Sequence, residues 1–255
     1  MIERLHPGPP ERLGPEELTR AYAPRDGGAP SVRFNFVVSA DGAATLGGRA
    51  GGLGNADDQR ILLLLRRLSD VLLLGAGTVR AEGYGGELLD AAGLAWRREH
   101  RATDRPALAV LSGSLDLDPA SAFFAEAQVR PLVFTTGRAA AAAPAEVAEV
   151  AEIVAAGERR VDPDRVVREL WARGHSRILC EGGPHLFGSF QDAGRVDELC
   201  LTVSPLLVGG PNLRVAVSGA EHAAPLALTQ VLRSEGMLFL RYLTERPSLE
   251  KAGTS

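Results

Sequence analysis

The feature of this sequence that most restricts its fold is a series of short apolar runs that alternate with stretches of helical periodicity. Most of these runs are continuous and rich in Val, Leu and Ile, which is typical of strands buried on both faces of a parallel sheet. The runs lie at residues 32–39, 70–75, 106–112, 131–136, 152–156, 176–183 and 196–210. Because strands that alternate with helices form βαβ units, we predict an α/β fold with a mostly parallel sheet.

Capping signals predict where two of the intervening helices begin. Asn55 has the chemistry of an N-cap and is followed by acidic residues in the first turn, so a helix is expected from there to about residue 68. Asp162 is expected to cap a second helix, with Pro163 in its first position and its end near Gly174. Each of these helices then leads directly into the next predicted strand.

The two ends of the chain differ from this pattern. Residues 1–30 are rich in Pro, Gly and charge and are predicted to form an N-terminal arm. Residues 227–244 contain two strand-like runs divided at 235–236, which predicts a hairpin and therefore an antiparallel edge on a mixed sheet. Because no linker divides the remainder, one domain is expected over 31–246, with a tail at 247–255.

Composition excludes several classes of protein. The formal net charge of −4 argues against general nucleic-acid binding, which needs a basic surface. The chain has only 2 cysteines, so we expect neither a disulfide framework nor a cysteine-rich zinc site, and no metal is expected. No apolar run is long enough to span a membrane, and the first residues lack the apolar region of a secretory signal. We therefore expect a cytoplasmic protein.

Glycine-rich turns follow predicted strands at 39–55, 75–85 and 181–189. Ligands of open α/β sheets bind beyond the carboxyl ends of the strands, so these turns should gather on one edge. The two shorter turns lead into helices whose first amide groups can bind an anion such as a pyrophosphate. Either could be only a tight strand-to-helix turn, but two of them in one sheet favour a dinucleotide. The longer loop could close over a substrate, and its Asp41 could either cap a turn or orient a ligand.

At these turns the chain resembles the reductase domain of the deaminase–reductase of riboflavin biosynthesis. The matching segments, in the same order and at similar spacing, are SADG (39–42), the helix with Arg66, GAGTVRA (75–81), EGGP (181–184), VDEL (196–199) and PLLVGG (205–210). The resemblance implies a three-layer dihydrofolate-reductase-like fold, usually dimeric. It implies an NADPH-dependent reductase, and the expected substrate is 5-amino-6-(5-phosphoribosylamino)uracil, a small heterocycle whose ribose is reduced to ribitol.

The resemblance also implies which residues bind the cofactor. Thr78 matches a threonine that contacts the phosphates, residues 182–189 match the pyrophosphate turn, and Ser112 with Gly113 lies where such enzymes meet the adenosine 2′-phosphate. The positions expected to bind NADPH are Ala44, Gly75, Gly77, Thr78, Glu82, Ser112, Gly113, Gly182, Gly183, Leu186 and Phe187.

Other residues are implied on the substrate side. Asp41 and Glu181 are expected to be the catalytic carboxylates that hydrogen-bond the substrate. Arg66 is expected to bind the ribose phosphate, with Asn35 and Ser39 as further substrate contacts. Arg66 could equally be a solvated charge on the surface of its helix.

The chain departs from the family pattern mainly on this substrate side. Ala43 stands where the family usually has Lys or Arg, and residues 82–84 read Glu-Gly-Tyr where many members have Asp-Asp-Pro. A dihydrofolate or pteridine reductase that uses Asp57 or Asp58, and a nucleotide-binding protein without turnover, therefore remain alternatives. The zinc deaminase motifs H-x-E and P-C-x-x-C are absent from the sequence, so only the reductase function is expected.

Overall fold

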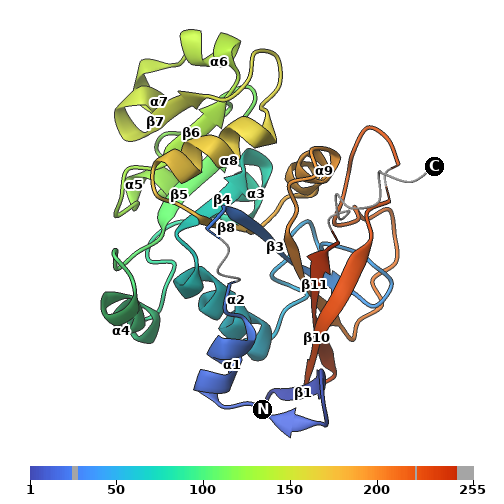
Figure 1. The fold of residues 1–255 in the computed structure, drawn as a ribbon. Helices are drawn as coiled ribbons and strands as arrows, with labels where there is room; N and C mark the ends of the chain where they lie inside the picture. The colour runs from blue at the N-terminus through green and yellow to red at the C-terminus, as the bar shows by residue number, and fades with distance from the viewer. Residues whose placement is uncertain (25–27, 222, 246–255) are drawn as a thin grey trace, which may run out of the picture.

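A computed structural model describes residues 1–24, 28–221 and 223–245 of the chain. Its strands form one mixed sheet (Figure 1). The strands with parallel neighbours are β3 (Ser31–Ser39), β4 (Val71–Gly75), β5 (Ala107–Leu111), β6 (Leu132–Thr135), β7 (Glu152–Ala155), β8 (Arg177–Cys180) and β9 (Glu198–Ser204). The remaining strands are β1 (Glu3–His6), β2 (Glu11–Arg12), β10 (Leu226–Ser234) and β11 (Met237–Thr244).

The strand order explains why the sheet is mixed. It runs β2-β1-β10-β11-β9-β3-β8-β4-β5-β6-β7. From β9 to β7 all neighbours are parallel, whereas β11, β10, β1 and β2 add antiparallel strands beyond β9. The predicted mostly parallel sheet with a C-terminal antiparallel hairpin is therefore confirmed. Residues 235 and 236 form the hairpin turn, where Ser234 pairs with Met237 and both turn residues have positive φ.

Helices cover both faces of the sheet. They are α1 (Pro15–Ala21), α2 (Ala56–Leu68), α3 (Ala76–Glu82), α4 (Ala91–His100), α5 (Ala122–Ala125), α6 (Gly137–Ala141), α7 (Ala145–Val150), α8 (Pro163–Ala172) and α9 (Pro184–Asp192). Apolar side chains of α8 and α9 pack on one face, and those of α1, α2, α3 and α5 pack on the other. The predicted three-layer architecture is confirmed. No helix in the described residues is long and apolar enough to cross a membrane.

The predicted helix caps form as expected. The Asn55 side chain accepts hydrogen bonds of 3.0 Å from the amides of Asp57 and Asp58 at the start of α2. The Asp162 side chain accepts one of 2.9 Å from the amide of Asp164 at the start of α8. In each case a short polar side chain satisfies amide groups that the first helical turn leaves without partners.

The N-terminal segment differs from the predicted arm. Strand β1 pairs with β10, where Arg4 lies opposite Leu232, and β2 pairs with β1. Ile2, Leu13 and Leu18 are buried in the same apolar cluster as α2. The hairpin offers β1 an edge of unpaired backbone groups, and this partner is more than two hundred residues away in the sequence. The tail at 247–255 lies outside the described residues, and the division into arm, domain and tail remains a prediction.

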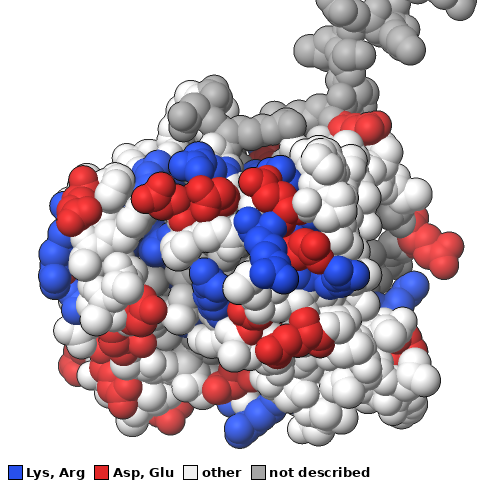
Figure 2. Space-filling view, turned by 90° about the horizontal axis from the view of Figure 1, so that it is seen from below, with Lys and Arg blue, Asp and Glu red and all other residues white. Residues whose placement is uncertain are grey.

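Charged groups are distributed in pairs over the surface. Figure 2 shows one face, on which basic and acidic side chains lie next to one another rather than in separate areas. Exposed or half-buried ion pairs of this kind include Arg105–Glu87 at 2.7 Å and Arg20–Glu17 at 2.8 Å. Such pairs are screened by water and contribute little to stability.

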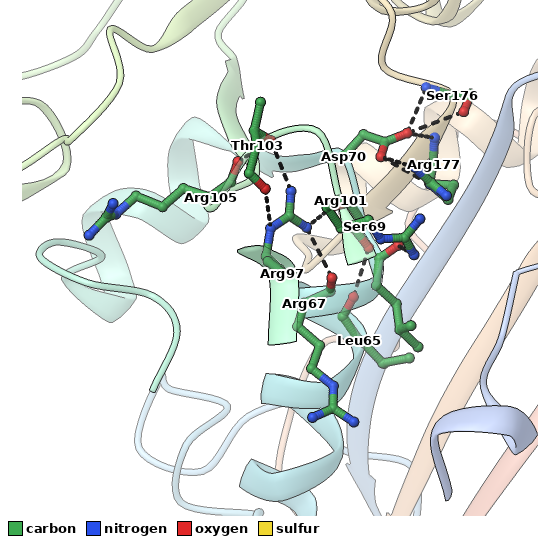
Figure 3. Close-up of polar contacts among 11 residues, drawn as sticks. Leu65, Arg67, Ser69, Asp70, Arg97, Arg101, Thr103, Arg105, Ser176 and Arg177 are labelled. Carbon is green, nitrogen blue, oxygen red and sulfur yellow. Dashed lines mark hydrogen bonds and ion pairs between the residues drawn. The ribbon is translucent and has the colours of Figure 1, made fainter. Parts of the chain in front are cut away.

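A buried arginine attaches the insertion between β4 and β5 to the rest of the domain. Arg97 on α4 is 1% exposed and donates to the carbonyl oxygens of Arg67 and Ser69, at the carboxyl end of α2 (Figure 3). It also donates to the carbonyl of Thr103. A cation at a helix carboxyl end satisfies carbonyls that lack helical partners. Residues 84–104, expected to be a loop or a helical insertion, thus contain helix α4, which Arg97 attaches to the end of α2.

Asp70 joins the amino ends of two neighbouring parallel strands. Its Oδ1 accepts from the guanidinium of Arg177 at 2.6 and 3.0 Å, and its Oδ2 accepts from the amides of Ser176 and Arg177 at 3.0 and 2.9 Å (Figure 3). Burial alone would raise the pKa of Asp70, but these hydrogen bonds and the Arg177 charge outweigh burial and lower it. The ionised carboxylate therefore stabilises the alignment of β4 with β8.

We predict that Asp70→Asn lowers the free energy of unfolding by about 1.5–3 kcal/mol at pH 7, because it removes a charge-assisted hydrogen-bond network. The folded-state pKa of Asp70 is lowered, so its contribution is complete above the unfolded-state pKa of about 3.9 and is lost as the pH falls through the folded-state value. Urea unfolding from pH 7 to pH 3 measures this. The control Asp116→Asn removes an exposed ion pair with Arg80 and should change stability by less than about 0.5 kcal/mol.

Candidate functional site

A cavity of about 1360 Å³ lies at the carboxyl ends of the parallel strands. Segments that follow β4, β5, β6, β7 and β8 line it, together with the end of β3, the glycine-rich loop and the first turns of α2. This is the edge at which open α/β sheets bind ligands. Among the described residues, no group of three or more His, Cys, Asp or Glu side chains could hold a metal ion.

The structure brings most of the predicted site residues to this cavity. The predicted residues that line it are Asn35, Ala44, Arg66, Gly75, Gly77, Thr78, Glu82, Ser112, Gly113, Glu181, Gly182, Gly183 and Leu186. They come from segments that are far apart in the sequence and meet because parallel strands end at one edge. Their individual roles remain predictions.

Ser39, Asp41 and Phe187 do not line the cavity. Asp41 is exposed and accepts hydrogen bonds from the Ser39 hydroxyl and from the amide groups of Val208 and Gly209. These contacts, the Ser39 hydrogen bond first, lower the pKa of Asp41 to about 2. The geometry favours the turn-capping interpretation of Asp41, in which the carboxylate joins two loops. Phe187 packs instead in the apolar core.

The two shorter glycine turns touch each other and form a cradle of bare backbone. The Gly75 amide donates to the Gly182 carbonyl at 3.0 Å. A Cβ added at Gly183 would lie 2.9 Å from Thr78 Oγ1, which is closer than real Cβ contacts. Gly182 has a φ of 116°, a conformation that residues with side chains rarely adopt. Because Gly183 also caps the amino end of α9, this cradle has the shape and the amide groups to hold a pyrophosphate.

The long glycine-rich loop forms another wall of the cavity. Its lining residues are small, among them Thr45, Gly48 and Gly51. The Glu82 carboxylate accepts a hydrogen bond of 2.7 Å from the Ala50 amide and so attaches the loop to the end of α3. Glu82, predicted to contact the cofactor, therefore also positions this loop.

Arg66 and Glu181 form a buried ion pair across the cavity wall. Arg66 Nε and one terminal nitrogen donate to the two carboxylate oxygens, each at 2.7 Å. The side chains are 9% and 2% exposed. Tyr84 donates to Glu181 Oε2 at 2.8 Å, and its ring lies 5.6 Å from the Arg66 guanidinium. Arg66 is therefore not a solvated charge on the surface of its helix, because its guanidinium is bound to Glu181. Its expected contact with the ribose phosphate stays a prediction.

The ionisation of this cluster follows from its burial. Burial alone would lower the pKa of Arg66, but the adjacent Glu181 carboxylate outweighs burial and raises it. Burial, with the negative charge of Glu181, raises the pKa of Tyr84 well above its usual value. Arg66 thus remains charged and Tyr84 remains a hydrogen-bond donor at neutral pH.

The structure also shows cavity residues that the sequence pattern did not single out. Arg159 and Arg160 follow β7 and line the cavity together with Ser112, Ser114 and Thr136. Both side chains are exposed, so the cavity has two arginines beside the predicted cofactor residues Ser112 and Gly113. The sequence did not mark these arginines as cavity residues for two reasons. Strand β7, which precedes them, is short, and only the strand order places the end of β7 near the end of β5.

Comparisons with known proteins show the family and the fold. A family model described as the RibD C-terminal domain matches residues 30–236. The 2,5-diamino-6-ribosylamino-4(3H)-pyrimidinone 5′-phosphate reductase of Methanothermobacter thermautotrophicus is 30% identical over 193 residues, 74% of this chain and 84% of the relative. The reductase of the same name from Archaeoglobus fulgidus is 30% identical over 205 residues, 80% of this chain and 93% of the relative. A pyrimidine reductase-like protein from Corynebacterium diphtheriae has a similar structure, with a TM-score of 0.77, 28% identity and coverage of 85% and 92% of the two chains.

We predict that Arg66→Met lowers the free energy of unfolding by about 3–5 kcal/mol, because it leaves the Glu181 carboxylate buried without its cation. Urea unfolding measures the loss. The double variant Arg66→Met with Glu181→Gln should recover part of it, since no unpaired charge is then buried. Arg60→Met, which removes an exposed charge from the same helix, is the control. A loss below about 1 kcal/mol for Arg66→Met would contradict the buried pair.

Proposed function

The chain belongs to the RibD C-terminal domain family of riboflavin-pathway pyrimidine reductases, and we propose that it uses NADPH to reduce the sugar of a pyrimidine ribosylamine phosphate. The observation that carries the proposal is the cavity itself. It combines a backbone cradle suited to a pyrophosphate with a buried, hydrogen-bonded carboxylate beside it. When bound, the nicotinamide supplies a hydride to the sugar carbon that is joined to nitrogen, so that ribose becomes ribitol.

The residues of the chain hold and orient the reactants. The cradle of Gly75, Gly182 and Gly183 would bind the pyrophosphate through its backbone, with Thr78 adding a hydroxyl. In the described residues Glu181 Oε2 accepts from both Arg66 and Tyr84, whereas Oε1 accepts only from Arg66. A carboxylate oxygen can accept two hydrogen bonds, so Oε1 retains capacity for a substrate hydroxyl. Glu181 would position the sugar, and water would supply the proton to nitrogen.

NADPH is proposed over NADH because of the cations after β7. Arg159 and Arg160 are exposed and line the cavity after β7, and Ser112 and Thr136 line it after the neighbouring strands β5 and β6. Guanidinium groups bind phosphate through charge-assisted hydrogen bonds, and NADH, which has a 2′-hydroxyl in place of the 2′-phosphate, cannot form them.

We propose that the substrate is a small heterocyclic compound. We also propose a cytoplasmic location, since Cys180 and Cys200 are both free thiols.

The function is tested by following the oxidation of NADPH by the purified full chain. Three candidate substrates are tested. They are 5-amino-6-(5-phosphoribosylamino)uracil, the corresponding 2,5-diaminopyrimidinone ribosylamine phosphate, and dihydrofolate. We expect turnover with a pyrimidine ribosylamine phosphate and none with dihydrofolate. Turnover of dihydrofolate alone would favour the pteridine alternative, and cofactor binding without turnover of any substrate would favour the inactive alternative.

We predict that Arg159→Ala with Arg160→Ala weakens NADPH binding about tenfold or more and leaves NADH binding nearly unchanged, because only NADPH carries the 2′-phosphate. Fluorescence titration gives both dissociation constants. Arg165→Ala, which removes a nearby arginine that does not line the cavity, is the matched control. An equal loss of affinity for NADPH and NADH would show that these arginines do not bind the 2′-phosphate.

A homodimer is proposed from one face of the antiparallel part of the sheet. In the register of β9 with β11, Val203 lies opposite Leu238 and Leu201 opposite Leu240. These side chains point away from the face that α2 covers, because successive strand residues alternate between faces. Leu228 and Leu238 are 42% and 36% exposed. An apolar strand face of this kind is typical of a subunit interface.

We predict a dimer mass by light scattering at micromolar concentration and a monomer for Leu238→Asp, because a carboxylate in the middle of an apolar interface would be desolvated without a partner. Val129→Asp, an exposed position on the other half of the molecule, should leave the dimer intact. A wild-type monomer would refute the proposal.

A further inference from the structure

Tyr84 lines the cavity, and its hydroxyl group has no role in the function described above. The residue follows α3 in a turn whose other members, Gly83, Gly85 and Gly86, lack side chains. A Cβ added at Gly85 would overlap the Ala122 side chain of α5, so the turn lies close against that helix. The glycines thus let the turn pack closely while its one large side chain reaches the cavity wall.

The Tyr84 hydroxyl makes the two oxygens of the Glu181 carboxylate unequal. It donates to Oε2 at 2.8 Å, and a terminal nitrogen of Arg66 donates to the same oxygen at 2.7 Å. In the part of the chain that the structure describes, Oε1 accepts one hydrogen bond, which comes from Arg66 Nε. A carboxylate oxygen can accept two hydrogen bonds, so Oε2 is complete and Oε1 is open to one further donor.

Arg66 alone would not produce this difference. Its two donors bind one carboxylate oxygen each, both at 2.7 Å, in the bidentate geometry typical of arginine–carboxylate pairs. Without the Tyr84 hydroxyl both oxygens would keep the same capacity, and a substrate hydroxyl could bind to either. Burial, with the charge of Glu181, raises the pKa of Tyr84, so the phenol keeps its proton and stays a donor at neutral pH.

The packing around this contact holds it in place. The Tyr84 ring packs against the apolar cluster that contains Val79 of α3, and it lies 5.6 Å from the Arg66 guanidinium. The Glu181 side chain is 2% exposed, so a ligand reaches only a small part of it. Many members of the family have Pro at the position of Tyr84, and Pro carries no hydroxyl. The contact therefore lies outside the shared motifs.

We propose that Tyr84 is a positioning residue for the reduction, because its hydroxyl completes Oε2 of Glu181 and leaves Oε1 as the oxygen that accepts from the sugar. This inference rests on the proposed reductase function and deepens it. Tyr84 acts through Glu181 and takes no part in the transfer of hydride or proton. A single point of attachment fixes the sugar relative to the nicotinamide, and a misplacement of about 1 Å can cost a large part of the rate.

The test is a double-mutant cycle on NADPH oxidation, with the pyrimidine ribosylamine phosphate that the wild-type chain reduces faster. Tyr84→Phe keeps the ring and removes the hydroxyl. We expect it to lower kcat about tenfold, because Glu181 can then bind the sugar through either oxygen. Glu181→Gln should lower kcat further. In the Glu181→Gln background, Tyr84→Phe should change kcat by less than about twofold, since its effect passes through the carboxylate.

Two further measurements separate positioning from a general structural defect. Tyr84→Phe removes a donor from the ionised form of Glu181, so the acid limb of kcat/KM should move to higher pH. A structural defect would instead lower the rate by the same factor at every pH. The NADPH dissociation constant, measured by fluorescence titration, should stay within about twofold of the wild-type value, because the glycine cradle is unchanged. Tyr242→Phe, which removes a hydroxyl from β11 outside the cavity, is the matched control and should keep the wild-type kcat and pH profile.

A Tyr84→Phe variant that binds NADPH normally and keeps the wild-type kcat would overturn the proposal. Losses that multiply in the double variant would also overturn it, because Tyr84 would then act independently of Glu181. In both cases the reductase function itself stands. If the wild-type chain reduces neither pyrimidine, the proposed function fails and the role of Tyr84 fails with it.

Discussion

The parallel pairing of β8 between β3 and β4 is the constraint on which the rest of this structure depends. Cys180, the last residue of β8, lies opposite Phe34 of β3 and Leu73 of β4. The residues that follow it therefore emerge between the ends of two other strands. Gly182 receives a hydrogen bond from the Gly75 turn, and Glu181 meets the helix that precedes β4. One alignment of strands thus assembles the backbone cradle and the buried carboxylate together.

Helix α2 connects this cradle to the substrate side of the cavity. Its carboxyl-terminal half carries Arg66, whose pairing with Glu181 fixes the helix against the end of β8. Its amino-terminal turn carries Asp58 and is held by the Asn55 cap and by the hydrogen bond between Asp57 and Ser234 of β10. A buried ion pair gains little net stability because both charges lose water, but a helix joined to the sheet at both ends can hold its side chains in fixed positions.

The charged groups of the cavity differ in whether an oppositely charged side chain of the protein pairs with them. This difference indicates which kind of ligand contact each group can make. Glu181 is neutralised within the protein and is suited to orienting a ligand. Arg159 and Arg160 are exposed and suited to a phosphate that arrives with the cofactor. Asp58 is half-buried and lines the cavity, and within the part of the chain that the structure describes it forms no ion pair. Groups that need a ligand to complete their hydrogen bonds provide specificity, because a ligand that lacks the matching group leaves them unpaired.

The sequence by itself determined the strands, the helices and the glycine turns, because periodicity, caps such as Asn55 and bare glycine backbone are local properties. It also indicated the family, through motifs at a fixed spacing. Only the tertiary structure decided how the side chains are used. Arg66 pairs with a carboxylate 115 residues away, Asp41 caps a loop outside the cavity, and β1 joins the sheet through a distant hairpin. These contacts depend on partners that are remote in sequence, and only the order and alignment of the strands bring those partners together.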